Sequence, residues 1–79
     1  MKISVYTTPS CYYCKKVKEF LKVNNIPFES VDVQDDIDKR TEMIELSGQF
    51  GVPVVRIDDA FFVGYNQQKL NDLKEKYHE

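Results

Sequence analysis

The sequence predicts an α/β fold with the element order βαβαββα. Three observations lead to this prediction. Apolar residues alternate with polar ones near the start of the chain, they recur at helical spacing in three later stretches, and two short apolar runs flank Asp58-Asp59. The chain has 79 residues, so we expect a single domain over 1–79 with a modest core.

The first predicted strand covers about residues 2–7, because Ile3 and Val5 alternate with polar neighbours. Pro9 ends this strand, and a helix follows Cys11. One face of that helix is apolar and repeats every three to four positions. This face contains Cys14, Val17, Leu21 and Asn24, with Phe20 at its margin, and the helix ends at Asn24-Asn25.

A second strand places Val31 and Val33 on one face. Together with the first strand and helix it forms a βαβ unit, which requires a parallel pair of strands and a right-handed crossover. Asp35 and Asp36 supply cap chemistry for a second helix, and Gly48 suits its C-terminal end. We expect the buried face of this helix to contain Ile37, Thr41, Ile44 and Ser47.

Residues 53–57 and 60–63 predict two strands that form a hairpin. Gly64 and Asn66 precede a last helix, in which Leu70, Leu73 and Tyr77 recur at helical spacing. Three aromatic side chains are expected in the core or against the sheet, namely Phe28, Phe61 and Phe62.

Composition and charge argue against two classes of function. The net charge is -2, which does not suit nucleic-acid binding, and no stretch approaches the roughly 20 apolar residues of a membrane-spanning helix. The first ten residues also lack the apolar run of a signal peptide. We therefore expect a cytoplasmic protein that binds neither nucleic acids nor membranes. Separately, we expect the protein to be a monomer.

The chemistry is expected at Cys11 and Cys14. Two thiols three positions apart cannot stabilise a fold, because the loop that they close is trivial. In a reducing compartment such a pair is more often catalytic or metal-binding. Structural zinc takes four ligands, whereas this chain has no third cysteine and only one histidine, His78. We therefore expect no metal site within the chain.

The two thiols are expected to differ. Cys11 falls where a strand ends and a helix begins, and the free N–H groups and dipole of a helix start stabilise a thiolate. Cys14 lies one turn further along on the apolar face, where burial disfavours the charged form. We therefore predict that Cys11 attacks a disulfide and that Cys14 resolves the mixed disulfide. The alternative is a chance pair of inert thiols.

Three segments resemble the glutaredoxin family. Residues 6–14 (Tyr-Thr-Thr-Pro-Ser-Cys-Tyr-Tyr-Cys) look like its active-site segment. Residues 47–53 (Ser-Gly-Gln-Phe-Gly-Val-Pro) resemble its Thr-Gly-Gln-x-Thr-Val-Pro stretch, and residues 63–66 (Val-Gly-Tyr-Asn) fall where the family has a Gly-Gly pair before a helix. The resemblance implies a thioredoxin-like fold, a four-stranded mixed sheet flanked by three helices, with a cis bond before Pro53.

The resemblance also implies a substrate site beside the thiols, formed by Val52-Pro53, Tyr13 and the 64–66 segment. The backbone of Val52 would pair with an extended substrate, and Tyr13 would line the same groove. Gly64, Tyr65 and Asn66 would lie where glutathione-binding members hold the tripeptide. Tyr65 replaces a glycine there and would crowd a carboxylate, whereas Asn66 would cap the last helix and leave N–H groups for one.

Tyr12 and Thr8 also depart from the family, which often has proline and lysine at these positions. The resemblance implies an oxidoreductase without a bound cofactor, acting on disulfide-containing proteins or on glutathione mixed disulfides. Glutathione or a flavoprotein of the thioredoxin-reductase type would restore the dithiol. A different alternative is a dimer that holds a metal or an iron–sulfur cluster between two chains, with Cys11 as a ligand.

Overall fold

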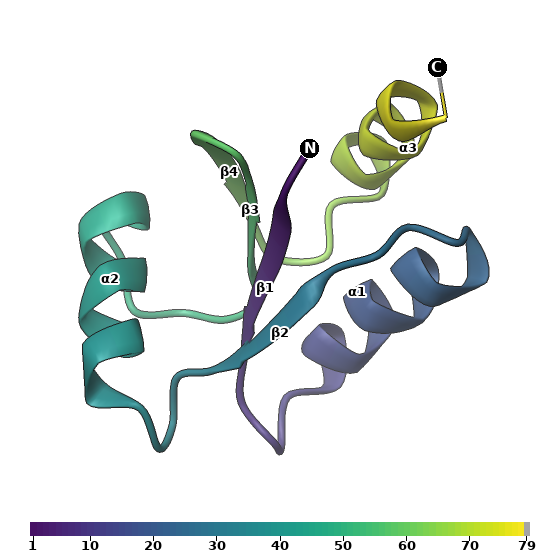
Figure 1. Ribbon diagram of the computed structural model, residues 1–79. Coiled ribbons are helices and arrows are strands. Elements are labelled where there is room, and N and C mark those ends of the chain that lie inside the picture. Colours follow the sequence, from purple (N-terminus) through teal and green to yellow (C-terminus); the bar gives the residue numbers. More distant parts are fainter. Residues whose placement is uncertain (79) are drawn as a thin grey trace.

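The chain folds into one mixed sheet with helices on both of its faces (Figure 1). The computed structural model describes residues 1–78, so Glu79, the last residue of the predicted domain, lies outside the described residues. In chain order the elements are β1 (Ile3–Thr7), α1 (Tyr12–Val23), β2 (Glu29–Asp32), α2 (Ile37–Ser47), β3 (Val54–Ile57), β4 (Ala60–Val63) and α3 (Gln67–Tyr77). The predicted order βαβαββα and the thioredoxin-like architecture are confirmed.

The strands lie in the order β2-β1-β3-β4. β1 pairs in parallel with β2 and antiparallel with β3, and β3 pairs antiparallel with β4. Because β1 and β2 run in the same direction, their carboxyl ends meet at one edge of the sheet. The loop that leads to Cys11 leaves the sheet at this edge.

The core has two parts, one on each face of the sheet. In Figure 1, α1 and α3 cover one face and α2 covers the other. The side chains of β1 alternate between the two faces, with Ile3 and Val5 toward α1 and α3 and Tyr6 toward α2. The larger part contains Ile3, Val5, Val17, Leu21, Ile26, Val55, Phe62, Leu70 and Leu73. The smaller part contains Tyr6, Val31, Val33, Met43 and Val54.

The two ends of α2 are set by residues that the sequence predicts. The carboxylate of Asp36 caps α2 by accepting a hydrogen bond from the Lys39 N–H at 3.1 Å, so the cap is Asp36 and not Asp35. Gly48 ends α2 in the left-handed conformation, with φ of 72°. These local signals fix where α2 starts and stops.

The predicted buried face of α2 is wrong at two positions. Ile37 is 71% exposed and Thr41 is exposed, whereas Met43 is completely buried. Ile44 packs against the same small cluster. Compared with the prediction, the helix is rotated about its axis so that Met43 faces the sheet. The spacing of apolar residues in the sequence does not distinguish this orientation from the predicted one.

Two smaller predictions also change. Phe28 and Phe62 pack in the core as expected, but Phe61 is 40% exposed, because its side chain points to the opposite face of the edge strand β4 from that of Phe62. The strand expected from residue 53 begins at Val54, since Pro53 has no N–H for the sheet ladder. Within the described residues, the longest apolar helical stretch falls short of what a membrane-crossing helix requires.

Candidate active site

Cys11 occupies the junction between β1 and α1. It is the N-cap residue of α1 and has an extended backbone, with φ of -87° and ψ of 117°. Its sulfur accepts a hydrogen bond from the Cys14 N–H at 3.1 Å, in the place where a serine or aspartate oxygen usually caps a helix. The Cys11 sulfur therefore lies at the positive end of the helix dipole, where negative charge is favoured.

Cys14 lies in a different environment. It is completely buried on the inner face of α1, beside Val17 and Leu21. Burial raises the pKa of the Cys14 thiol, and its hydrogen bond with Cys11 raises that pKa further, while the Thr7 hydroxyl opposes the shift. Both cysteines are free thiols in this structure. The sequence prediction of a buried, less acidic second thiol agrees with this arrangement.

The loop before β3 faces the Cys11 sulfur. The Val52–Pro53 peptide bond is cis, and the Cys11 thiol points to the Val52 carbonyl oxygen with an Sγ–O distance of 4.0 Å. Gly64, in the left-handed conformation with φ of 80°, donates its N–H to the Pro53 carbonyl at 2.8 Å. The structure thus brings together Cys11, Val52, Pro53 and Gly64, which come from separate parts of the chain.

Tyr13 is in the first turn of α1, two positions after Cys11. Its side chain is 58% exposed and packs edge-on against the ring of Tyr12, with 5.2 Å between the ring centroids. The ammonium group of Lys16 lies 5.5 Å from the centroid of the Tyr12 ring, which is within the range of a cation–π interaction. An exposed aromatic pair therefore follows Cys11 directly in the chain, in the first turn of α1.

Tyr65 and Asn66 make their hydrogen bonds at the start of α3. The ring of Tyr65 packs against the larger core cluster, and its hydroxyl donates to the Gln67 side chain at 2.8 Å. Asn66 caps α3 by accepting a hydrogen bond from the Lys69 N–H at 3.1 Å. The expectation that Tyr65 crowds a carboxylate stays a prediction.

Two residues of the α2–β3 loop were not assigned a role from the sequence. The side-chain amide of Gln49 binds both backbone groups of Gly51, and Phe50 between them is 79% exposed. Both lie in the segment that resembles the family motif, but an aromatic residue is expected inside a protein more often than outside. No sequence signal indicates that Phe50 faces solvent.

The described residues offer no internal metal centre. Among residues 1–78, no three His, Cys, Asp or Glu side chains lie close enough together to hold a metal ion. A cluster shared between two chains would take its remaining ligands from outside this chain.

A thiol that caps a helix, a second thiol buried beneath it and a cis-proline loop opposite are the features of redoxins with the thioredoxin fold. The glutaredoxin family model matches residues 3–62. The chain belongs to the glutaredoxin family.

Two relatives illustrate the similarity. The chain is 50% identical over 74 residues to an uncharacterized glutaredoxin-like 8.6 kDa protein in the rubredoxin operon of Clostridium pasteurianum, covering 94% of this chain and 99% of that protein. It is 34% identical over 56 residues to glutaredoxin 3 of Escherichia coli, covering 71% of this chain and 68% of that protein.

Two solved structures share the fold over most of their length. The crystal structure of a thioredoxin-like protein, BC3987, has a TM-score of 0.85 and 40% identity, covering 91% of this chain and 99% of that chain. The glutaredoxin-like protein NrdH-redoxin of Escherichia coli, whose structure was described for its thioredoxin-like activity profile, has a TM-score of 0.79 and 26% identity, covering 92% of this chain and 95% of that chain.

Proposed function

We propose that this protein is a dithiol–disulfide oxidoreductase that reduces disulfides of proteins, or their mixed disulfides with glutathione, through Cys11 and Cys14. One observation carries the proposal. The Cys11 sulfur caps α1 and is partly exposed, whereas Cys14, whose N–H lies 3.1 Å from that sulfur, is completely buried. The first thiol can meet a substrate, and the second can reach only the first.

The reaction has two exchange steps. The Cys11 thiolate attacks one sulfur of the substrate disulfide, forms a mixed disulfide and releases the other sulfur as a thiolate that takes up a proton. The Cys14 thiol then loses its proton and attacks the Cys11 sulfur, which releases the second substrate thiol. The substrate gains two electrons and two protons, and Cys11–Cys14 becomes a disulfide. No prosthetic group takes part.

The Val52 carbonyl supports a defined approach of the substrate. It lies 4.0 Å from the Cys11 sulfur, so a chain that brings its disulfide to Cys11 passes alongside Val52. An extended segment can pair with a backbone group in such a place by strand addition. The backbone then orients the substrate whatever its side chains are.

The test is a pair of serine variants. We expect Cys14→Ser to accumulate a mixed disulfide with insulin, visible by mass spectrometry, because its resolving thiol is missing. Cys11→Ser should form none and should lose reductase activity by at least about a hundredfold, since a hydroxyl does not replace the attacking thiolate. A Cys11→Ser variant with full disulfide reductase activity would refute the proposal.

The reductant is a separate part of the proposal. The similarity to Escherichia coli NrdH-redoxin, and a tyrosine at position 65, favour a thioredoxin-reductase-type flavoprotein over glutathione. NADPH consumption distinguishes them, measured with oxidised protein and either thioredoxin reductase or glutathione plus glutathione reductase. Turnover with glutathione at rates equal to those with the flavoprotein would contradict this preference, and Tyr65→Gly should increase glutathione turnover if the tyrosine crowds the tripeptide.

The proposed setting is the cytoplasm, where a reducing environment keeps such a pair available as thiols. The protein would act as a monomer, because the proposed exchange needs only the two thiols of one chain. Its size-exclusion volume during turnover tests this part.

A further inference from the structure

Phe50 is a large apolar side chain that faces solvent beside the candidate active site. It is 79% exposed and lies two positions before Val52. A single exposed apolar residue is common on protein surfaces and needs no explanation by itself. The loop that holds Phe50 and the hollow beside it distinguish this residue from an ordinary exposed apolar side chain.

The loop around Phe50 is held by side-chain hydrogen bonds. The Gln49 amide donates to the Gly51 carbonyl at 2.9 Å and accepts from the Gly51 N–H at 2.8 Å. The Ser47 hydroxyl lies 2.7 Å from the Met43 carbonyl and 3.2 Å from the Gln49 carbonyl. This pairing restrains the backbone on both sides of Phe50 and so limits the region of solvent that its side chain can occupy.

Phe50 forms one wall of a hollow next to the candidate active site. The hollow has a volume of about 270 Å³ and is lined also by Val33, Met43, Val52 and Thr8. Val52 belongs both to this hollow and to the site, because its carbonyl oxygen lies 4.0 Å from the Cys11 sulfur. A substrate that reaches Cys11 is therefore adjacent to the hollow.

Arg40 is the one charged side chain among the described residues that line the hollow. Its guanidinium group already donates to the Val33 carbonyl at 3.0 Å and to the Gln34 carbonyl at 3.1 Å. The remaining lining is apolar or neutral, so an uncharged apolar group fits it better than the carboxylates of a tripeptide such as glutathione.

We infer that this hollow binds an apolar side chain of a protein substrate, close in sequence to the cysteine that Cys11 attacks, and that Phe50 sets a preference for protein disulfides over small ones. In a substrate segment paired along Val52, side chains on one face recur every second residue, about 6–7 Å apart. A residue two positions from the substrate cysteine thus reaches the hollow. The inference rests on the proposed function and specifies its substrate class.

The experiment compares two disulfides with pre-reduced protein and no added reductant. Acid-quenched mixtures give the second-order rate of thiol loss with insulin and with hydroxyethyl disulfide. We expect Phe50→Ala to lower the insulin rate about five- to tenfold more than the hydroxyethyl disulfide rate, as for truncation of an aromatic contact residue. Phe50→Leu, which keeps an apolar side chain, should recover most of the loss.

Val23→Ala is the matched control. Val23 is also 79% exposed, but it lies at the far end of α1 from Cys11, so both rates should stay at their original values. Equal rates for Phe50→Ala and the unmodified protein, or an equal loss with both disulfides, would overturn the inference. An unmodified protein inactive on both disulfides would instead refute the proposed function.

Discussion

At the scale of single residues, the two sulfurs share one helix but not one environment. Cys11 caps α1 with its sulfur, while Cys14, one turn later, is packed among apolar side chains. The difference follows from helix geometry, because the capping residue lies outside the helix and the third helical residue turns toward the sheet. One short segment can therefore supply both an attacking thiol, at the cap position, and a resolving thiol, at the third helical position.

The buried thiol predicts a pH dependence of stability. Burial raises the pKa of Cys14 in the folded protein, so the folded chain keeps this proton at pH values where the unfolded chain has lost it. The protonated Cys14 thiol therefore makes its full contribution to the free energy of unfolding below about pH 8.5, the usual thiol pKa. This contribution is lost as the pH rises through the higher pKa of the folded state. We expect the free energy of unfolding to fall more steeply above about pH 8.5 than in Cys14→Ala.

Urea unfolding with excess dithiothreitol measures this difference at a series of pH values. Both proteins keep Tyr6, whose pKa is also raised by burial, so its titration contributes to both curves. Parallel curves for the two proteins would show that the Cys14 thiol does not titrate differently in the folded state.

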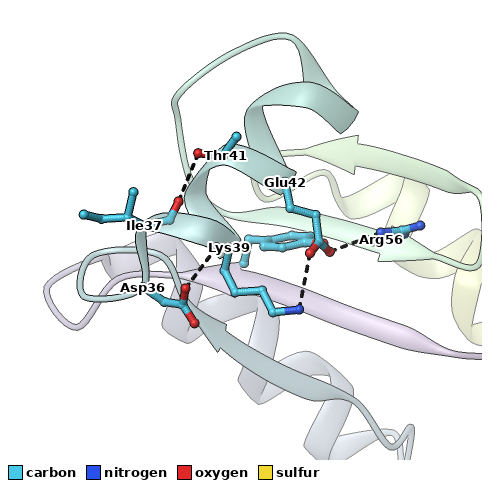
Figure 2. A network of polar contacts seen from close by, with 7 residues as sticks. Asp36, Ile37, Lys39, Thr41, Glu42 and Arg56 are labelled. Carbon is cyan, nitrogen blue, oxygen red and sulfur yellow. Dashed lines mark hydrogen bonds and ion pairs between the residues drawn. The ribbon is translucent and has the colours of Figure 1, made fainter.

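At the scale of elements, a polar network joins α2 to the sheet beside its apolar contact. The Glu42 carboxylate accepts hydrogen bonds from the buried Tyr6 hydroxyl at 2.7 Å and from Arg56 and Lys39 at 3.3 Å each. Figure 2 shows the Lys39 and Arg56 contacts converging on this one carboxylate of α2. Since Met43 is the only residue of α2 that is fully buried, the network supplements a small apolar contact.

Replacement of Glu42 tests that network. The hydrogen bond from Tyr6, followed by Lys39 and Arg56, lowers the pKa of Glu42 against the opposing effect of burial. The ionised Glu42 carboxylate therefore contributes to the free energy of unfolding above its unfolded-state pKa of about 4.3. This contribution is lost as the pH falls through the lower pKa of the folded state. Because Glu42 is partly exposed, we expect Glu42→Gln to cost only about 1 kcal/mol at neutral pH.

Unfolding curves at about pH 7 and pH 3 provide the measurement, and the cost should shrink at the lower pH. Glu45→Gln, on the exposed side of the same helix, serves as the control and should change stability by less than about 0.5 kcal/mol. A loss for Glu42→Gln that is the same at both pH values would exclude the carboxylate charge as its cause.

At the scale of the whole molecule, one sheet separates two apolar clusters. The cluster under α1 and α3 is the larger, and the one under α2 is small. β1 contributes side chains to both clusters, so neither helix layer can lose its packing without affecting the same central strand. A domain of this size is expected to unfold in one cooperative step.

Core truncations on the two faces test this cooperativity. Leu21 and Met43 are completely buried on opposite faces, so Leu21→Ala and Met43→Ala should each lower the free energy of unfolding by about 2–5 kcal/mol. Val23→Ala, at an exposed position of α1, should cost less than about 0.5 kcal/mol. Urea unfolding followed by circular dichroism should show one transition with an unchanged slope in all three variants, and a separate early transition in Met43→Ala would contradict the cooperative unit.

The sequence by itself determined the order of the elements, the junction that carries Cys11, a cap at Asp35 or Asp36 and the cap at Asn66. Each of these depends on residues a few positions apart, so local spacing and cap chemistry suffice. The resemblance to glutaredoxins added the cis bond before Pro53, which the structure contains. The exposure of Phe50 and the pairing of Gln49 with Gly51 had no such local signal.

Only the tertiary structure decided which face of α2 is buried and which distant groups meet. Two faces of α2 fit helical spacing equally well: one with Ile37, Thr41 and Ile44, and one centred on Met43. Only packing against the sheet selects between these two faces. The approach of Val52 to Cys11, and the hydrogen bond from Gly64 to Pro53, join segments far apart in the chain. Such contacts follow from the strand order β2-β1-β3-β4, which depends on the free energy of the whole sheet and not on any short stretch of sequence.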